Sequence, residues 1–201
     1  MLRFGITGKS GAGKSTVARL FEDYGVVHVD ADKVAHSIYE PGTPCAAELV
    51  AHFGPGILGE DGAIDRRRLS AIVFSDPDQL SALSAITHRY VGKAIEEIEQ
   101  KERAAGTKGL LIDAIALIES GVAARCDAVV GILAPKELRV ERIMAREGIS
   151  EAYARRRVEA QQGDEFFRAG CTHILVNDGA EGAPAFAERA LILFEQILEG
   201  D

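Results

Sequence analysis

The residues best able to do chemistry stand at positions 8–15, which read GKSGAGKS and follow an apolar stretch at 2–7. They fit the pattern G-x-x-x-x-G-K-[ST], a glycine-rich loop whose backbone N–H groups surround nucleotide phosphates. In this pattern Lys14 reaches the β- and γ-phosphates, and the Ser15 hydroxyl is a ligand of Mg²⁺. A plain turn between a strand and a helix is the alternative, but the flanking apolar and helical patterns favour a site for a nucleoside triphosphate. The residues predicted to form it are Gly8, Gly11, Ala12, Gly13, Lys14, Ser15 and Thr16.

Two acids follow a second apolar stretch at 26–29. On an extended segment Asp30 and Asp32 would point the same way, toward the phosphates. A kinase needs a carboxylate that accepts the proton of the attacking hydroxyl or holds the water shell of the metal, and we favour Asp32 for this role. The alternative makes Asp30 the N-cap of a helix that starts at Ala31.

Asp113 ends a third apolar stretch, where phosphate-loop proteins usually place the acid that holds the Mg²⁺ shell. Glu119 follows in a mostly apolar segment. Both acids could instead simply end or cap an element of structure.

Arginines are concentrated between positions 139 and 157. Arg139, Arg142 and Arg146 recur at i, i+3 and i+7 and so share one stripe of a helix, and three more follow at 155–157. A permanent planar cation suits the charge that develops on a transferring phosphoryl group, which favours a helical lid over the nucleotide. The alternative is a solvated face whose arginines pair with neighbouring glutamates.

Further polar residues have weaker signals. Arg66 and His88 would suit a second, anionic substrate, although each alone is more typical of ordinary surface. Asn177 begins an Asn-Asp-Gly sequence that is either a turn or a contact for an adenine ring, and the local pattern favours the turn. The other histidines lack metal-ligand spacing and are predicted to be structural: His28, His36, His52 and His173.

The elements that must position these residues alternate between strand and helix. Five strands are predicted, at 2–7, 26–29, 110–113, 128–133 and 173–176, the first two joined by a helix of about a dozen residues. Short helical pieces broken by proline and glycine fill 32–100, and the other predicted helices cover 87–105, 135–147, 150–162 and 184–198. The fold class is therefore α/β, a three-layer nucleoside-triphosphatase type with a five-stranded parallel sheet, a helical substrate-binding insertion and a helical lid.

Composition limits the function classes. The net charge of -8 and pI near 5.2 argue against a nucleic-acid-binding surface, and no apolar run approaches the ~18 residues of a membrane span. The N-terminus enters a strand directly, without the pattern of an export signal. Three distant cysteines fit no disulfide framework, so a cytoplasmic protein with reduced thiols is expected.

Taken together, these motifs resemble the dephospho-CoA kinase family, which uses ATP to phosphorylate the ribose 3′-hydroxyl of dephospho-coenzyme A in the last step of coenzyme A synthesis. The resemblance covers nearly the whole chain and rests on the order and spacing of its motifs. They are residues 7–16, 30–32, 40–44, 52–54, 61–66, 72–74, His88, the lid arginines Arg142 and Arg146, Gln161 and residues 177–179.

The resemblance implies a role for each matching residue. Lys14 and Ser15 would serve the phosphates and Mg²⁺, Asp32 would be the catalytic base, and Arg142 would act in the lid. Asn177 would lie near the adenine of ATP. Dephospho-CoA would be held by Asp32, Arg66, His88 and Asp113, with Asp32 and Asp113 also reaching Mg²⁺ through water. The implied parts are a nucleotide-binding core at 1–31, 106–135 and 163–201, a dephospho-CoA-binding region at 32–105 and a lid at 136–162.

The chain departs from the family pattern at several positions. Ile115 stands where a proline is common, and Arg89 follows His88 where another proline is usual. Lys9 replaces a common glycine of the loop, and Arg139 replaces a lid glutamine. These departures bear on substrate fit rather than on the reaction.

Two other functions compete. A kinase for a nucleoside or nucleotide would share the scaffold but would not need the pantetheine arm of the acceptor. A regulatory GTP switch would need an Asn-Lys-x-Asp guanine signature, and the pair at 177–178 lacks the lysine.

Overall fold

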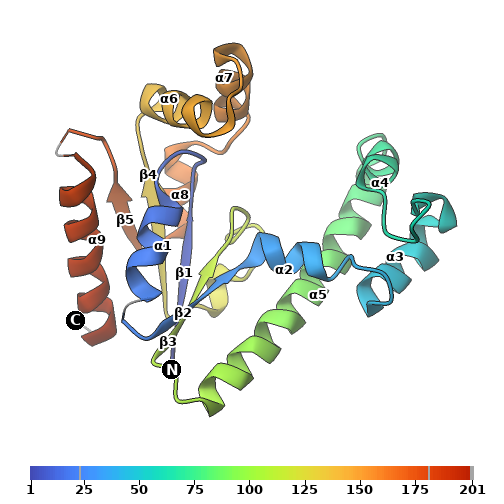
Figure 1. Ribbon diagram of the computed structural model, residues 1–201, viewed down its shortest axis with the longest axis horizontal. Helices are drawn as coiled ribbons and strands as arrows, with labels where there is room; N and C mark the ends of the chain where they lie inside the picture. The colour runs from blue at the N-terminus through green and yellow to red at the C-terminus, as the bar shows by residue number, and fades with distance from the viewer. Residues whose placement is uncertain (23, 181, 200–201) are drawn as a thin grey trace. The chain divides into compact units, whose positions relative to one another are not determined.

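The computed structural model describes residues 1–22, 24–180 and 182–199 (Figure 1). Residues 23, 181 and 200–201, which the sequence places in the nucleotide-binding core, lie outside this description. The chain divides into two compact units, Met1–Val29 with Glu102–Asp201, and Asp30–Lys101. The division by function predicted from the sequence, with boundaries at 32, 105, 136 and 162, stays a prediction.

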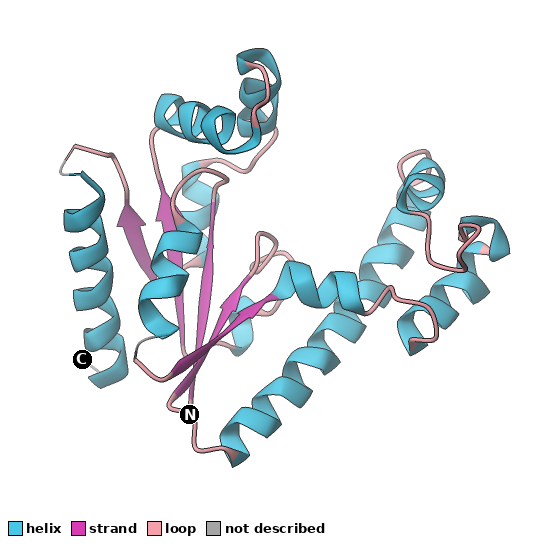
Figure 2. Cartoon of the chain, in the orientation of Figure 1, coloured by secondary structure: helices cyan, strands magenta, loops and turns pink. Residues whose placement is uncertain are grey.

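The first unit is built on a five-stranded parallel sheet (Figure 2). Its order is β2-β3-β1-β4-β5, and the central strand β1 pairs Phe4 with Leu111 on one side and with Ala128 on the other. Strands covered on both faces need continuous apolar runs, which is why they could be predicted. The five predicted strands are confirmed as β1 Leu2–Gly8, β2 Val26–Asp30, β3 Gly109–Asp113, β4 Ala128–Leu133 and β5 His173–Val176.

Helices form the layers on the sheet. On one face Phe21 of α1 (Lys14–Glu22) and Phe194 of α9 (Gly182–Glu199) pack in one buried cluster with Phe4 and Ile6 of β1. Helix α8 (Asp164–Gly170) contacts β4 and β5, and the short 3-10 helix η2 (Ala123–Arg125) precedes β4. The sequence analysis missed α8, and α1 has nine residues rather than about twelve.

The two helices predicted to form a lid are present as α6 (Lys136–Glu147) and α7 (Glu151–Glu159), while their action as a lid stays a prediction. The two helices share a small buried core of Val140, Ile143, Ala154 and Val158. Gly148 ends α6 with a φ of 65°, a conformation that glycine adopts without strain, and the Ser150 hydroxyl caps α7. The second helix ends at residue 159 rather than 162.

The second unit is helical. It comprises α2 (Ala31–Ser37), α3 (Pro44–Phe53), the 3-10 helix η1 (Pro55–Ile57), α4 (Arg66–Val73) and most of α5 (Pro77–Ala104). Helix α5 begins ten residues before the predicted start at Thr87, because Asp76 accepts hydrogen bonds from the N–H groups of Asp78 and Gln79 and Pro77 fits the first helical position. The unit has its own core of Cys45, Ala46, Leu49, Ile57, Ile64, Leu69, Val73 and Ile86.

None of the helices within the described ranges has the length and apolar character needed to cross a membrane.

Candidate active site

The phosphate loop joins β1 to α1, and three of its glycines have positive φ. The angles are 132° at Gly8, 78° at Gly11 and 112° at Gly13. A Cβ on Gly8 would lie 2.1 Å from the carbonyl oxygen of Ile132 in β4, so only glycine fits there. These positive φ values are open to glycine without strain, and they allow a loop to turn its N–H groups toward an anion.

Helix α1 begins at Lys14 and Ser15, the last two positions of the loop pattern. The Lys14 ammonium donates to the carbonyl oxygen of Gly8 at 3.0 Å, which holds it over the start of the loop. Ser15 and Thr16 are exposed in the first turn, and the N–H groups of Thr16 and Val17 donate to Gly13 O at 3.1 and 3.2 Å. The first turn of a helix carries partial positive charge, so loop and helix together favour an anion.

Asn177, directly after β5, lies 7 % exposed against this loop. Its Nδ2 donates to Ala12 O at 2.8 Å, and its Oδ1 accepts from Arg142 at 3.2 Å. Arg142 also donates to Gly11 O at 3.3 Å. The structure thus brings together the loop, Arg142 and Asn177, which were all predicted as nucleotide-binding residues. The contact between Asn177 and adenine stays a prediction.

The stripe of lid arginines on α6 divides into three environments. Arg139 is buried and donates from Nε to Ser10 O at 3.0 Å, Arg142 reaches Gly11 and Asn177, and Arg146 is exposed beside Glu147. Only the first two therefore contact the loop or its neighbours.

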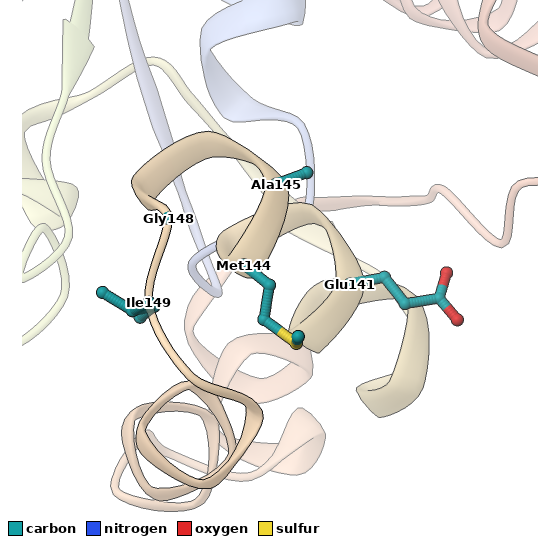
Figure 3. Close-up of a pocket in the computed structure, with 5 residues that line it drawn as sticks. All are labelled: Glu141, Met144, Ala145, Gly148 and Ile149. Atoms are coloured by element: carbon teal, nitrogen blue, oxygen red, sulfur yellow. The ribbon is translucent and has the colours of Figure 1, made fainter.

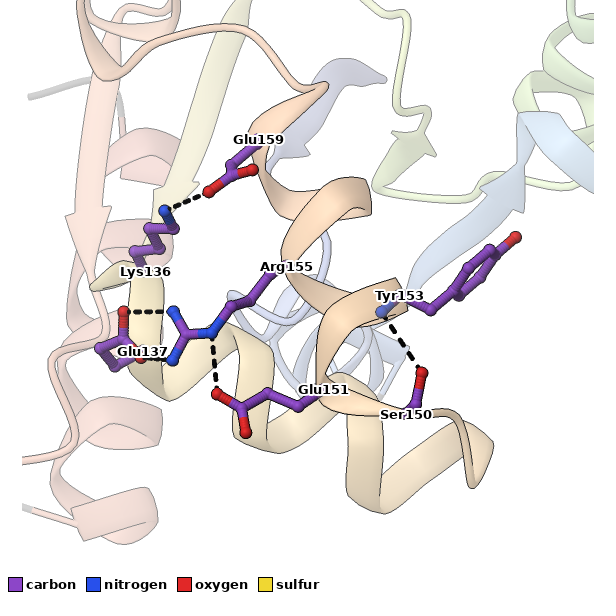
Figure 4. A network of polar contacts seen from close by, with 7 residues as sticks. All are labelled: Lys136, Glu137, Ser150, Glu151, Tyr153, Arg155 and Glu159. Atoms are coloured by element: carbon purple, nitrogen blue, oxygen red, sulfur yellow. Dashed lines mark hydrogen bonds and ion pairs between the residues drawn. The ribbon is translucent and has the colours of Figure 1, made fainter.

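Arg155 and Arg157 of α7 follow the alternative of a face paired with glutamates, and Figure 4 shows the contacts of Arg155. Arg155 donates to Glu137 at 2.9 and 2.6 Å and to Glu151 at 2.8 Å, while Lys136 donates to Glu159 at 2.6 Å. The hydrogen bonds from Arg155 lower the pKa of the Glu137 carboxyl. Exposed pairs of this kind fasten α7 to α6 but contribute little stability each.

The lid also carries an open, largely apolar pocket of about 560 Å³ (Figure 3), lined by Glu141, Met144, Ala145, Gly148 and Ile149. No charged cluster converges on it, so we assign it no part in the reaction.

Asp113 ends β3 with its side chain 17 % exposed. The His28 imidazole of the neighbouring strand β2 lies beside it, with Nε2 3.7 Å from Asp113 Oδ2 and Nδ1 3.5 Å from Glu22 Oε1. The sequence analysis predicted His28 to be structural because it lacks metal-ligand spacing to the other histidines. Its proximity to Asp113 could not be predicted, since it depends on the strand order. Glu119 is exposed after β3 and no observation assigns it a role.

The segment at Asp30 and Asp32 corrects one prediction. The two acids do not share an extended segment, because α2 begins at Ala31 and Asp32 lies in its first turn. Asp30 is the N-cap, and its Oδ1 accepts from the N–H groups of Asp32 and Lys33, both at 3.1 Å. Partial burial raises the pKa of Asp30, but the hydrogen bonds from Lys33 and Asp32 outweigh it and lower the pKa below its ordinary value. The cap is thus satisfied by Asp30, which leaves Asp32 as the candidate for chemistry.

Asp32 lines a cavity of about 340 Å³ within the helical unit, together with His36, Tyr39, Arg66, Leu69 and Leu83. Asp65 caps α4 at the position before Arg66, which directs the arginine to the start of that helix. Arg66 donates to His36 Nε2 at 2.6 Å and its guanidinium lies 5.7 Å from the centre of the Tyr39 ring. Two predicted substrate-binding residues, Asp32 and Arg66, therefore share one cavity. His88 is exposed on α5 and is not among the described lining residues.

Comparisons with known proteins identify the family of this chain. The family model described as dephospho-CoA kinase matches residues 2–182. The chain belongs to the dephospho-CoA kinase family. A dephospho-CoA kinase of Thermobifida fusca is 39 % identical over 183 residues, which is 90 % of each chain. This family membership also makes the chain a kinase.

Solved structures of this family and its neighbours share the fold. A protein from Thermus thermophilus, TT1252, is 35 % identical with a TM-score of 0.80 and covers 96 % of this chain and 97 % of its own. The dephospho-CoA kinase from Campylobacter jejuni is 27 % identical with a TM-score of 0.71, over 98 % of both chains.

Proposed function

We propose that this protein transfers the γ-phosphoryl group of ATP to the ribose 3′-hydroxyl of dephospho-CoA, giving coenzyme A and ADP in the cytoplasm. Membership of the dephospho-CoA kinase family supports the reaction, and one observation carries the site: the phosphate loop with its three positive-φ glycines, held by Arg142 and Asn177.

The roles of the residues follow from their chemistry. Lys14 and the N-terminus of α1 bind the phosphates, and Arg142 neutralises charge as the phosphoryl group moves. The 3′-oxygen attacks the γ-phosphorus, the bond to the β,γ-bridging oxygen breaks, and Asp32 accepts the hydroxyl proton. Arg66 and His88 hold the anionic part of the acceptor, and Asp113 contributes to acceptor binding.

Mg²⁺ fits the oxygen donors of this site. Among the described residues no group of three or more His, Cys, Asp and Glu could hold a metal by itself. Mg²⁺ is commonly bound by one or two protein oxygens with waters and substrate phosphates, and the exposed Ser15 hydroxyl offers such an oxygen. Asp32 and Asp113 would act through water. Bound there, the ion would neutralise charge on the β- and γ-phosphates.

An assay that couples ADP formation to NADH oxidation tests the proposal. With Mg²⁺, ADP should form only when dephospho-CoA is present, and mass spectrometry should identify coenzyme A. Lys14→Ala should lose ATP turnover with every acceptor. Tight ATP binding without turnover on dephospho-CoA would overturn the acceptor, and a panel of nucleosides and nucleotides would then identify the correct one. Normal turnover in Lys14→Ala would overturn the phosphate-loop assignment.

A further inference from the structure

The charged side chain of Arg139 is almost completely buried. It is 2 % exposed, and the other strongly buried polar residues in the described part of the chain are the uncharged Thr7 and Asn177. Removing a cation from water is costly unless partners or counter-charges replace the hydration. Desolvation accordingly lowers the pKa of Arg139, although a guanidinium keeps its proton at any physiological pH.

The hydrogen-bond partners of Arg139 are neutral. Its Nε donates to Ser10 O at 3.0 Å, and its Nη2 donates to Gln161 Oε1. Within the described ranges no carboxylate forms an ion pair with it. Asp164 attracts it from a greater distance, but that carboxylate is in direct contact with the Lys9 ammonium. The positive charge of Arg139 is therefore only partly compensated.

The same contacts fix the tip of the phosphate loop. Gln161 accepts from the Ser10 N–H at 3.1 Å and donates to the Ser10 hydroxyl at 3.0 Å, so Arg139 and Gln161 hold all three polar groups of Ser10. The next loop residue, Gly11, also lies close to helix α6, because a Cβ on Gly11 would be 2.8 Å from the backbone oxygen of Arg139. Helix α6 thus packs directly against the loop, and its buried cation lies just outside the loop backbone.

We infer that Arg139 is a positioning residue of the phosphate loop, and that its buried charge strengthens binding of the nucleotide's polyphosphate. The hydrogen bonds to Ser10 and Gln161 hold the loop in its anion-binding conformation. The part of the Arg139 charge that stays uncompensated attracts the β- and γ-phosphates through a medium of low dielectric, where Coulomb interactions are poorly screened. The inference rests on the proposed binding of ATP at this loop.

Three variants separate charge from geometry. Arg139→Lys keeps the charge and loses the forked donor, Arg139→Gln keeps a donor and loses the charge, and Arg139→Met loses both. Arg168→Gln removes an exposed arginine of α8 and is the matched control. Calorimetry would measure the dissociation constants of ATP and AMP for each variant at low and high salt, with melting temperatures recorded in parallel.

The expected result is selective for polyphosphate. Arg139→Gln and Arg139→Met should bind ATP about tenfold more weakly and AMP within twofold of the unaltered protein, and most of the difference for ATP should persist at high salt, because salt screens a buried charge only weakly. Arg139→Lys should keep the ATP dissociation constant within about threefold despite a lower melting temperature. The control should match the unaltered protein.

Two outcomes would overturn the inference: unchanged ATP binding in Arg139→Gln, or equal losses for ATP and AMP, which would mark a purely structural cross-link. If the uncharged variants fail to fold, Arg139→Lys decides alone, because a tenfold loss of ATP affinity with the charge retained would contradict the electrostatic role. Failure of the unaltered protein to bind ATP would instead overturn the proposed function itself.

Discussion

The side-chain amide of Asn177 occupies the place where a side chain at Gly13 would begin. A Cβ on Gly13 would lie 2.7 Å from Asn177 Nδ2, the atom that donates to Ala12 O. The end of the fifth strand is therefore fitted to the phosphate loop, although the two lie more than 160 positions apart in the sequence. This fit couples the shape of the loop to a residue outside the loop motif.

Gly13→Ala should consequently damage nucleotide binding. Alanine would be strained at a φ of 112° and would displace the Asn177 amide. A strained backbone residue costs about 1–3 kcal/mol, so the ATP dissociation constant should rise by roughly 5- to 150-fold. Gly163→Ala is the control, because Gly163 has a φ of -68° and no atom within 4 Å of its Cβ position. ATP binding by Gly13→Ala equal to that of Gly163→Ala would contradict the fit.

Asn177→Asp should destabilise the folded protein. A carboxylate would place an acceptor against Ala12 O, where the amide now donates, and the residue is buried. A buried polar group without its hydrogen bond costs about 1–3 kcal/mol, which for a chain of this size corresponds to a melting temperature lower by roughly 2–12 °C. Thermal unfolding followed by circular dichroism measures it. Asp178→Asn, at the exposed next position, should melt with the unaltered protein.

The sequence predicted Asn177 as part of a turn or as a contact for an adenine ring, and the structure shows why the local pattern could not decide. Asn-Asp-Gly is typical of a turn, and Asp178 does accept from the N–H of Ala180 as turns require. The burial of Asn177 depends on the order of strands, which brings the end of β5 to the phosphate loop. The loop motif itself was predictable because each of its positions has a local physical requirement.

Asp32→Asn should lower kcat by about 10²- to 10⁴-fold and leave the KM for ATP within about threefold, because the amide cannot accept the proton of the attacking hydroxyl. Asp78→Asn is a close control. Each acid is the second residue of its helix, α2 or α5. Each also lies two positions after an aspartate that accepts hydrogen bonds from the first N–H groups of that helix. Steady-state kinetics at saturating dephospho-CoA would measure the effect, and a kcat for Asp32→Asn near that of Asp78→Asn would remove Asp32 from the catalytic role.

The arrangement of Asp30 and Asp32 also differs from the one that the local sequence predicted. An alternation of acids predicts a shared face only while the segment stays extended, and Asp30 itself starts a helix by accepting two backbone N–H groups. The N-cap signal was visible in the sequence and was weighed as the alternative. What could not be predicted is the cavity, since Arg66 and Tyr39 meet only after α2 and α4 pack together.

His36 lies between two predicted substrate-binding residues, which gives the last prediction. Its Nδ1 is 2.6 Å from the backbone oxygen of Asp32, which can only accept, and its Nε2 is 2.6 Å from Arg66, which can only donate. With these partners the imidazole donates from Nδ1 and accepts at Nε2. In this form it holds the Arg66 guanidinium at the cavity.

His36→Ala should raise the KM for dephospho-CoA by about tenfold, the loss expected for one hydrogen bond to a charged group, with the KM for ATP unchanged. His36→Gln should restore most of the affinity, because its amide oxygen reaches the depth of Nε2, whereas His36→Asn is too short to reach Arg66. His52→Ala, an exposed histidine of the same helical unit outside the cavity, is the control. If Gln and Asn behave alike, or if the KM for ATP rises in parallel, His36 does not act through Arg66.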